Sequence, residues 1–377
     1  MRKMSPTTEL SAFQITPSTA AVELPAPYPP HTTFPLSLSP SKPDTPLPDL
    51  LSEIHRLSST GAIHTLLASH GGAIHFRNLP LRSAAAFSHF AHAFGWTPHE
   101  TIGNPVRRTT LAPNVATANE GPPTLPIYPH NEFALSPHHP AYVLFYCLAA
   151  PTAGGETPIN NSLVLHEQLR ARHPEFFEEL DKRGGVQYQL FYPDDRGREA
   201  AAAAAKSPGS GVLQAWGAHV RDTDDVATAR RKVEAEIKRL PTATWAWEEK
   251  KDRGGDDDDD SKALGDLRVW QRLPAVRPHP RTGQPSFFNN AVSRFLNAER
   301  AGTLMPPHLV REEEGGDGDD HPPPPIYGRG RYQPPAFYGD GGVIPREYFD
   351  SAVRFIEETR ALVKWAEGDV LLLDVSV

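Results

Sequence analysis

The sequence predicts a mainly β fold of the α+β class, a β-sandwich decorated with helices, and three observations support this. The segments that carry recognisable motifs have the alternating or continuous apolar patterns of strands. Segments with helical spacing occur at intervals between those strands, and no internal repeat is present. A chain of 377 residues is long enough to bury a sizeable core in one large domain or two modest ones.

Several short segments are expected to form strands, because their apolar residues alternate or run continuously. These segments are 73–77, 142–148, 186–192, 267–270 and 370–373. The run at 142–148 is nearly all apolar and contains aromatic residues. We therefore expect that strand to be buried on both faces.

The expected helices lie between these strands and show apolar residues at intervals of three and four. They cover 48–69, the phenylalanine stripe 87–94, 163–180, 226–240 and 346–362. The stripe formed by Phe87, Phe90 and Phe94 is interpreted as a face that packs on the core. Glycine pairs follow the first and third helices and are expected to end them.

Low-complexity composition sets the expected domain organisation. Residues 1–45 are rich in Pro, Ser and Thr without a sustained period, which predicts a flexible arm. The folded domain is then expected over 46–377. Insertions are expected within it near 194–210, 250–262 and 311–325, where alanine, aspartate and proline runs occur.

Composition also excludes several functional classes. A net charge of −8 argues against nucleic acid as the main partner, because phosphates require a basic surface. The longest apolar stretch, 141–150, is about half of the roughly 20 residues that a membrane span needs. Cys147 is the single cysteine, so internal disulfides are excluded. We expect a protein of a reducing compartment, most simply the cytoplasm.

The tripeptide His130-Asn131-Glu132 is the strongest candidate for chemistry. On an extended segment residues two apart point to the same side, so one divalent metal can take a nitrogen and an oxygen from this stretch. These are two of the three ligands of a 2-His-1-carboxylate site. A second match, His173-Pro174-Glu175, lies in a helical pattern, where residues two apart diverge.

Two further motifs follow the tripeptide. The first is Gly154-Gly155-Glu156-Thr157-Pro158, whose glycines are also typical of a plain hairpin turn. The second is the run 365–374, in which a tryptophan precedes Gly-Asp and a continuous apolar strand.

Taken in order, these motifs resemble the TauD/TfdA family of Fe(II)- and 2-oxoglutarate-dependent dioxygenases, and in particular its clavaminate synthase-like branch. The resemblance extends from about residue 36 to residue 374. It implies a double-stranded β-helix (jelly roll), Fe(II), 2-oxoglutarate as cosubstrate, O2 and a small organic substrate. It implies His130 and Glu132 as metal ligands and Thr157 as the hydroxyl donor to the far carboxylate of 2-oxoglutarate. By position, Asn119 and Asn289 are candidates to line the substrate side, or structural hydrogen-bonding residues.

The chain departs from the family pattern after Asp374. Members of the family continue to a distal histidine and then to an arginine that binds 2-oxoglutarate, whereas this sequence reads Val375-Ser376-Val377. We expect the last strands to be missing and the strand 370–373 to lack its next partner. We also expect weaker Fe(II) binding, and impaired oxygenase activity, than in a version extended by that tail.

Three downstream histidines stand beside prolines. We interpret them as histidines of surface loops and not as replacement ligands. They are His279, His308 and His321.

Two other functions remain open on the sequence. One is a catalytically inactive jelly-roll scaffold or interaction protein. The other is a metal-dependent hydrolase that uses His130 and Glu132 with a further ligand. The residue pattern carries no signal for the oligomeric state or the identity of the substrate.

Overall fold

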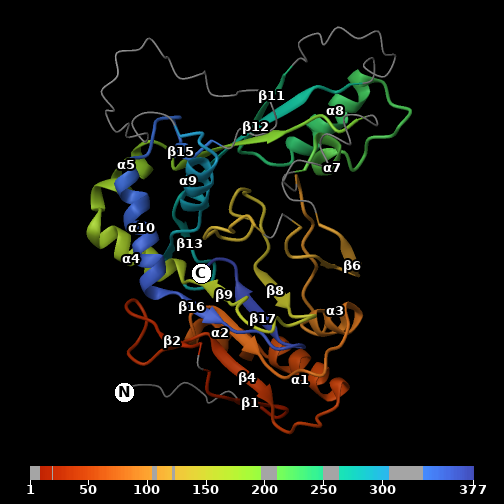
Figure 1. The fold of residues 1–377 in the computed structure, drawn as a ribbon, viewed down its shortest axis with the longest axis vertical. Coiled ribbons are helices and arrows are strands. Elements are labelled where there is room, and N and C mark those ends of the chain that lie inside the picture. The colour runs from red at the N-terminus through yellow and green to blue at the C-terminus, as the bar shows by residue number, and fades with distance from the viewer. Residues whose placement is uncertain are drawn as a thin grey trace.

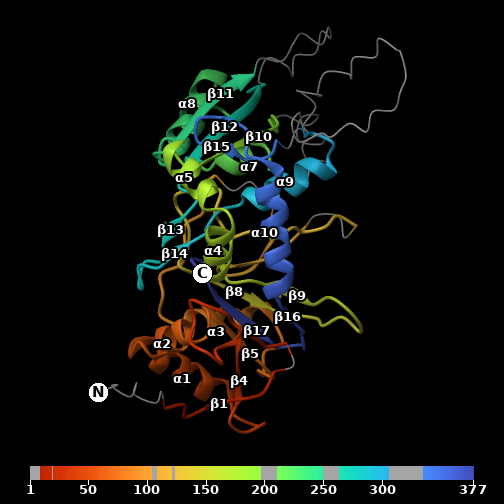
Figure 2. The ribbon, with the colours of Figure 1, turned by 90° about the vertical axis from the view of Figure 1, so that its left-hand side faces the viewer.

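The computed structural model describes residues 9–18, 20–103, 108–120, 124–196, 210–248, 263–304 and 334–377. These residues form a mixed structure of helices and strands. Two larger sheets lie toward opposite ends of the long axis, and the antiparallel pair α4 (Ser162–Arg172) and α10 (Arg346–Thr359) stands along one side between them (Figures 1 and 2).

The first sheet has five strands in the order β1-β4-β5-β17-β8. Their bounds are Phe13–Ile15, Leu36–Pro40, Ala73–Phe76, Val370–Asp374 and Tyr142–Tyr146, in that order. β4 and β5 run parallel, and the other neighbours are antiparallel. The strands predicted at 73–77 and 370–373 are confirmed.

β17 is buried at its first three residues. Val370 and Leu372 pack into one apolar cluster and Leu371 into another, and all three have no exposed area. The prediction that this segment lacks a neighbouring strand is wrong, because β5 and β8 bond to its two edges. β8 lies at the sheet edge and its residues are half-buried. The expectation that it is buried on both faces is therefore also wrong.

Three helices belong to the apolar cluster of the five-stranded sheet. They are α1 (Leu47–Ser59), α2 (Ala62–Ser69) and α3 (Ala84–His92). The helical segment predicted at 48–69 is divided in two, because Gly61 adopts φ of 77°, a left-handed conformation that costs glycine little. The phenylalanine stripe faces this core as predicted, with Phe90 fully buried.

The second sheet has four antiparallel strands in the order β11-β12-β10-β15. Their bounds are Ala243–Glu248, Asp266–Leu273, Val186–Tyr192 and Phe337–Tyr338. One apolar cluster joins this sheet to α7 (Val212–Trp216) and α8 (Val226–Ile237). Another joins it to α4, α5 (Pro174–Lys182), α9 (Ala291–Arg300) and α10.

The continuous helix predicted at 163–180 is wrong. α4 ends at Arg172 and α5 begins at Pro174, because proline disfavours the helical conformation of the preceding residue and has no N–H. α9 was not predicted at all.

Four two-stranded ladders complete the described strands. They pair β2 (Val22–Glu23) with β3 (Thr33–Phe34), β6 (Thr110–Ala112) with β7 (Val115–Ala116), β9 (Thr157–Ile159) with β16 (Ala361–Val363), and β13 (Arg277–Pro278) with β14 (Pro285–Ser286). Within the described ranges the strands form open sheets and no closed barrel.

The segment before residue 45 is not the flexible arm expected from its composition. Its strands β1 and β4 extend the five-stranded sheet, and Phe13, Leu36 and Leu38 are almost fully buried. Alternating small polar residues and prolines had concealed this pattern. The expected insertions lie outside the described residues, except for 194–196 and residue 210.

The helices of the described ranges were also compared with the length of a bilayer. None of them combines enough residues with enough apolarity to cross a membrane.

Candidate metal centre

The side chains of His130 and Glu132 face each other, although the tripeptide does not lie on the extended segment that was expected. Glu132 and Phe133 lie in a turn that is closed by a hydrogen bond from the N–H of Ala134 to the carbonyl of Asn131. His130 Nε2 and Glu132 Oε1 lie 3.2 Å apart. Two ligand atoms that each lie about 2.1 Å from one metal are roughly 3.0 Å apart in octahedral geometry and 3.4 Å in tetrahedral geometry. The pair therefore already has the separation of two neighbouring ligands of a single ion.

The other ring nitrogen of His130 fixes the orientation of the imidazole. His130 Nδ1 lies 2.8 Å from the carbonyl oxygen of Tyr128, and this oxygen can only accept. The ring therefore donates from Nδ1. Nε2 faces the Glu132 carboxylate, which also can only accept, so the protonated ring donates from both nitrogens, and a metal bound at Nε2 would take the place of that second proton. A hydrogen bond from the ring nitrogen that does not bind the metal, here Nδ1 to the Tyr128 carbonyl, is usual for metal-binding histidines.

The electrostatic surroundings also favour a charged carboxylate here. Burial, the largest influence, acts to raise the pKa of Glu132, but His130 and Arg108 together outweigh it and hold that pKa below its usual range. Burial likewise acts to lower the pKa of His130, but its contacts with Glu132 and Tyr128 raise it overall. Arg108 Nη2 lies 4.0 Å from Glu132 Oε2. The side chains of His130 and Glu132 are 36% and 20% exposed, so a ligand can reach them.

Thr157, expected to contact the cosubstrate, lies at the first position of β9. Its hydroxyl oxygen accepts a hydrogen bond of 2.8 Å from Trp365 Nε1. Because an indole nitrogen can only donate, the hydroxyl hydrogen of Thr157 must point to another acceptor. Among the interactions of the described residues, no hydrogen bond or ion pair joins Thr157 to the tripeptide.

A buried pair lies beside Trp365. His75 Nε2 and Asp369 Oδ2 are 3.2 Å apart, and these side chains are 2% and 1% exposed. The contact is close, but it is not aligned as a hydrogen bond. The Asp369 carboxylate accepts the main-chain N–H groups of Asn78 and Ala366 at 2.9 and 3.0 Å. The His75 ring meets the Trp365 ring edge to face, 5.7 Å between centroids. This packing fixes the loop that carries Trp365.

The two asparagines proposed for the substrate side have different surroundings. Asn289 is 5% exposed, and its amide donates to the carbonyl of Ala275 at 2.9 Å and accepts from Ala291 N–H at 2.9 Å. Both ends of that side chain therefore bond to main chain. Asn119 is exposed and follows Ala118, whose carbonyl accepts from Arg108 at 3.0 Å. This contact places the residue that precedes Asn119 beside Arg108, whose Nη2 lies 4.0 Å from Glu132 Oε2.

His279 is not the surface histidine that its neighbouring prolines suggested. It is 5% exposed, its Nε2 lies 3.2 Å from Asp374 Oδ2, and its Nδ1 accepts the N–H of Thr282 at 3.1 Å. The turn between β13 and β14 folds inward onto the end of β17, which a local pattern cannot reveal. His308 and His321 lie outside the described residues.

Within the described part of the chain, no group of three or more His, Cys, Asp and Glu side chains is arranged to hold a metal ion. His130 and Glu132 therefore fit two positions of a metal's coordination sphere. The sequence analysis missed the outer contacts of this pair, made by the carbonyl of Tyr128 and by Arg108. Neither contact leaves a sequence signal, because one is main chain and the other depends on loop packing.

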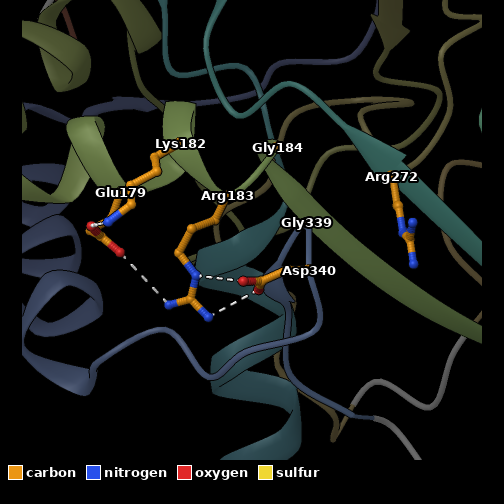
Figure 3. A pocket seen from close by; sticks show the side chains of 7 residues that line it. All are labelled: Glu179, Lys182, Arg183, Gly184, Arg272, Gly339 and Asp340. Carbon is orange, nitrogen blue, oxygen red and sulfur yellow. Dashed lines mark hydrogen bonds and ion pairs between the residues drawn. The ribbon is translucent and has the colours of Figure 1, made fainter.

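A surface cavity of about 650 Å³ lies elsewhere, against the four-stranded sheet (Figure 3). Its charged groups mostly pair with one another: Arg183 forms two hydrogen bonds with Asp340, at 2.8 and 3.0 Å, and Lys182 Nζ lies 3.3 Å from Glu179. No histidine or cysteine lines it. It offers no ligand pair comparable to the tripeptide.

Comparison with known proteins identifies the family of this chain. The model of the taurine catabolism dioxygenase TauD, TfdA family matches residues 34–375. The chain belongs to this family of dioxygenases, as its motifs indicated. Among curated proteins it is similar to a clavaminate synthase-like protein of Arabidopsis thaliana, with 27% identity over 358 residues, which cover 94% of this chain and 91% of the plant protein.

Proposed function

We propose that this protein is an Fe(II)- and 2-oxoglutarate-dependent oxygenase that oxidises a small organic substrate with O2. The observation that carries the proposal is the 3.2 Å separation of His130 Nε2 and Glu132 Oε1, which suits two neighbouring ligands of one ion. Membership of the TauD/TfdA family supports the choice of iron and cosubstrate. It also supports a jelly roll as the fold of this domain.

Different residues of the chain have different roles in such a site. His130 and Glu132 hold the metal, and the Tyr128 carbonyl keeps the imidazole in the tautomer that leaves Nε2 for it. Bound Fe(II) supplies the activation of O2, and the protein supplies the cage and the orientation. A carboxylate also suits Fe(II), because it gives a hard anionic oxygen ligand.

We assign Thr157 to the far carboxylate of 2-oxoglutarate. The support is the hydrogen bond from Trp365, which occupies the hydroxyl oxygen and directs the hydroxyl hydrogen toward another acceptor. A carboxylate is the strongest acceptor available for such a hydrogen. Asn119 is proposed to line the substrate side, because its neighbour Ala118 bonds to Arg108 and Arg108 faces Glu132. For Asn289, the two main-chain bonds support a structural role.

Turnover of 2-oxoglutarate tests the proposal without knowledge of the oxidised substrate. The purified chain is incubated aerobically with Fe(II) and 2-oxoglutarate, and succinate is measured. We expect succinate formation that His130→Ala and Glu132→Ala reduce by more than the roughly 10–100-fold typical of losing an outer contact. His173→Ala is the matched control, because it alters the other His-x-Glu match and should leave turnover unchanged.

Two outcomes would contradict an oxygenase. Equal succinate formation by the unsubstituted chain and both ligand variants would show that His130 and Glu132 are not ligands of the metal. Absence of both succinate and bound metal would favour the non-catalytic scaffold, for which the lack of a three-ligand group among the described residues is the supporting observation. Tightly bound zinc without succinate would favour a hydrolase.

The single cysteine supports a reducing compartment. Cys147 is buried and carries no disulfide, and burial is the main cause that raises the pKa of its thiol. We propose the cytoplasm on this ground.

A further inference from the structure

The middle residue of the tripeptide is held from several directions. The main-chain N–H of Asn131 donates to Asn290 Oδ1 at 2.8 Å, and its side-chain amide donates to Ser162 Oγ at 2.8 Å. Its side-chain oxygen accepts from the N–H of Asn289 at 3.3 Å. Asn290 and Ser162 are each only 7% exposed. Hydrogen bonds in such a buried place are costly to lose, because the orphaned group has no water to replace its partner.

Asn290 makes this contact instead of the one its position favours. It is the residue at the N-terminal cap of α9, where an asparagine side chain normally accepts an N–H of its own helix. Its side chain makes no such cap bond. The main-chain N–H of Asn290 in turn donates to the hydroxyl of Tyr188, a fully buried residue of β10, at 2.8 Å. The side-chain carbonyl of Asn290, which could cap α9, therefore bonds to the tripeptide instead. The hydrogen bond from the Asn290 main chain to Tyr188 fixes its position.

The backbone just beyond the tripeptide is strained. Phe133 has φ of 59°, in the left-handed region that bulky residues rarely occupy. Such a conformation costs about 1–3 kcal/mol and persists only where the surroundings impose it. The next residue, Ala134, is fully buried against Phe288, which immediately precedes Asn289. The segment 288–290 therefore contacts the tripeptide at its middle residue, Asn131, and the chain just after it, at Ala134.

We propose that Asn290, acting through Asn131, is a positioning residue of the metal site: its side-chain carbonyl holds the main chain of the tripeptide so that His130 and Glu132 face one ion. Ser162 assists from the first turn of α4. This role rests on the proposed function, because it assumes that the pair binds metal. Asn290 does not touch the metal or a substrate.

The test uses Co(II), a divalent ion with visible absorption bands that report ligand geometry, added to the full-length chain. We expect Asn290→Ala to weaken Co(II) binding by about 10–100-fold and to alter the spectrum, as losses of outer contacts typically do. Asn290→Asp keeps an acceptor oxygen and should bind within about 3-fold of the unsubstituted chain. Asn297→Ala is the matched control, because this asparagine of α9 bonds within its own helix and not to the tripeptide.

Ser162→Ala provides a milder variant if Asn290→Ala does not fold, with an expected loss of about 3-fold. Amide hydrogen exchange over residues 130–134 is a second readout that needs no metal. We expect faster exchange in Asn290→Ala and exchange like that of the unsubstituted chain in Asn290→Asp and Asn297→Ala.

The possible failures are distinguishable. Unchanged exchange in Asn290→Ala, or unchanged Co(II) affinity and spectrum, would overturn the positioning role while leaving the metal site intact. If the unsubstituted chain binds Co(II) no better than His130→Ala, the proposed metal site itself fails, and the role of Asn290 in it fails too.

Discussion

At the scale of single residues, the hydrogen bond between Trp365 and Thr157 shows how a donor without acceptor capacity can set the direction of a hydroxyl. Trp365 Nε1 can only donate, so the oxygen of Thr157 must accept. The hydroxyl hydrogen is left to point toward another acceptor. In Trp365→Phe an aromatic ring is kept but the N–H donor, and with it this restraint, is lost.

We therefore predict that Trp365→Phe raises the dissociation constant for 2-oxoglutarate by about 3–10-fold, the effect of one hydrogen bond of about 1 kcal/mol. Metal affinity should not change. Titration calorimetry of the metal-loaded chain measures both. Trp247→Phe is a matched control, since it removes the indole hydrogen bond from Trp247 of β11, in the four-stranded sheet, to Glu234 of α8. Equal 2-oxoglutarate affinity in the unsubstituted chain and both variants would refute this role of Trp365.

The element that most depends on tertiary context is β17. It bonds to β5 and β8 along its two edges and contacts apolar clusters on both faces. A strand in this position should tolerate little loss of volume, because a cavity in a packed core cannot collapse fully.

We predict that Leu372→Ala lowers the free energy of unfolding by about 2–5 kcal/mol. The control is Leu362→Ala on β16, whose side chain is 41% exposed and whose loss should cost about 0.5 kcal/mol or less. Urea unfolding measures both losses, provided that the m-value is the same in the variants and the unsubstituted chain. Similar losses in the two variants would show that β17 does not occupy the core in solution.

At the scale of the whole molecule, Glu53 connects the N-terminal segment to α1. Its carboxylate accepts from the N–H and the hydroxyl of Ser11 at 2.8 and 2.7 Å, and it pairs with Arg56 at 2.7 Å. The hydrogen bond from Arg56 is the main cause that lowers the pKa of Glu53 from 4.5 to about 2, and the bonds from Ser11 add to it. Ionised Glu53 therefore stabilises the fold.

Because the folded pKa is the lower one, this contribution is present above pH 4.5 and is lost as the pH falls toward 2. We predict that Glu53→Gln reduces the free energy of unfolding by about 1.5–3 kcal/mol at pH 7. The difference from the unsubstituted chain should narrow below pH 4.5. Denaturant unfolding at pH 7 and pH 3 tests this. Glu358→Gln, at an exposed pair on α10, should leave the pH profile unchanged. A difference independent of pH would contradict the assignment.

Local patterns were reliable where one face of an element decides its structure. The phenylalanine stripe of α3 and the strand β10 lie as their periodicities predicted. Local patterns failed where the contact that decides the structure comes from a distant part of the chain, or where a single residue interrupts a regular pattern. Pro174 split a helix whose apolar spacing continues across the break, and β1 and β4 found partners in a segment whose composition indicated disorder.

The sequence by itself determined the family and the candidate metal-binding pair. It contains a histidine and a carboxylate two residues apart, and the order of its motifs indicated the TauD/TfdA family, which the family model confirms. Only the tertiary structure decided what holds that pair in place. Asn290 lies 159 residues from Asn131, and Trp365 lies 208 residues from Thr157. Periodicity reports the local direction of side chains, whereas these hydrogen bonds exist only because packing brings distant segments within 3 Å of each other.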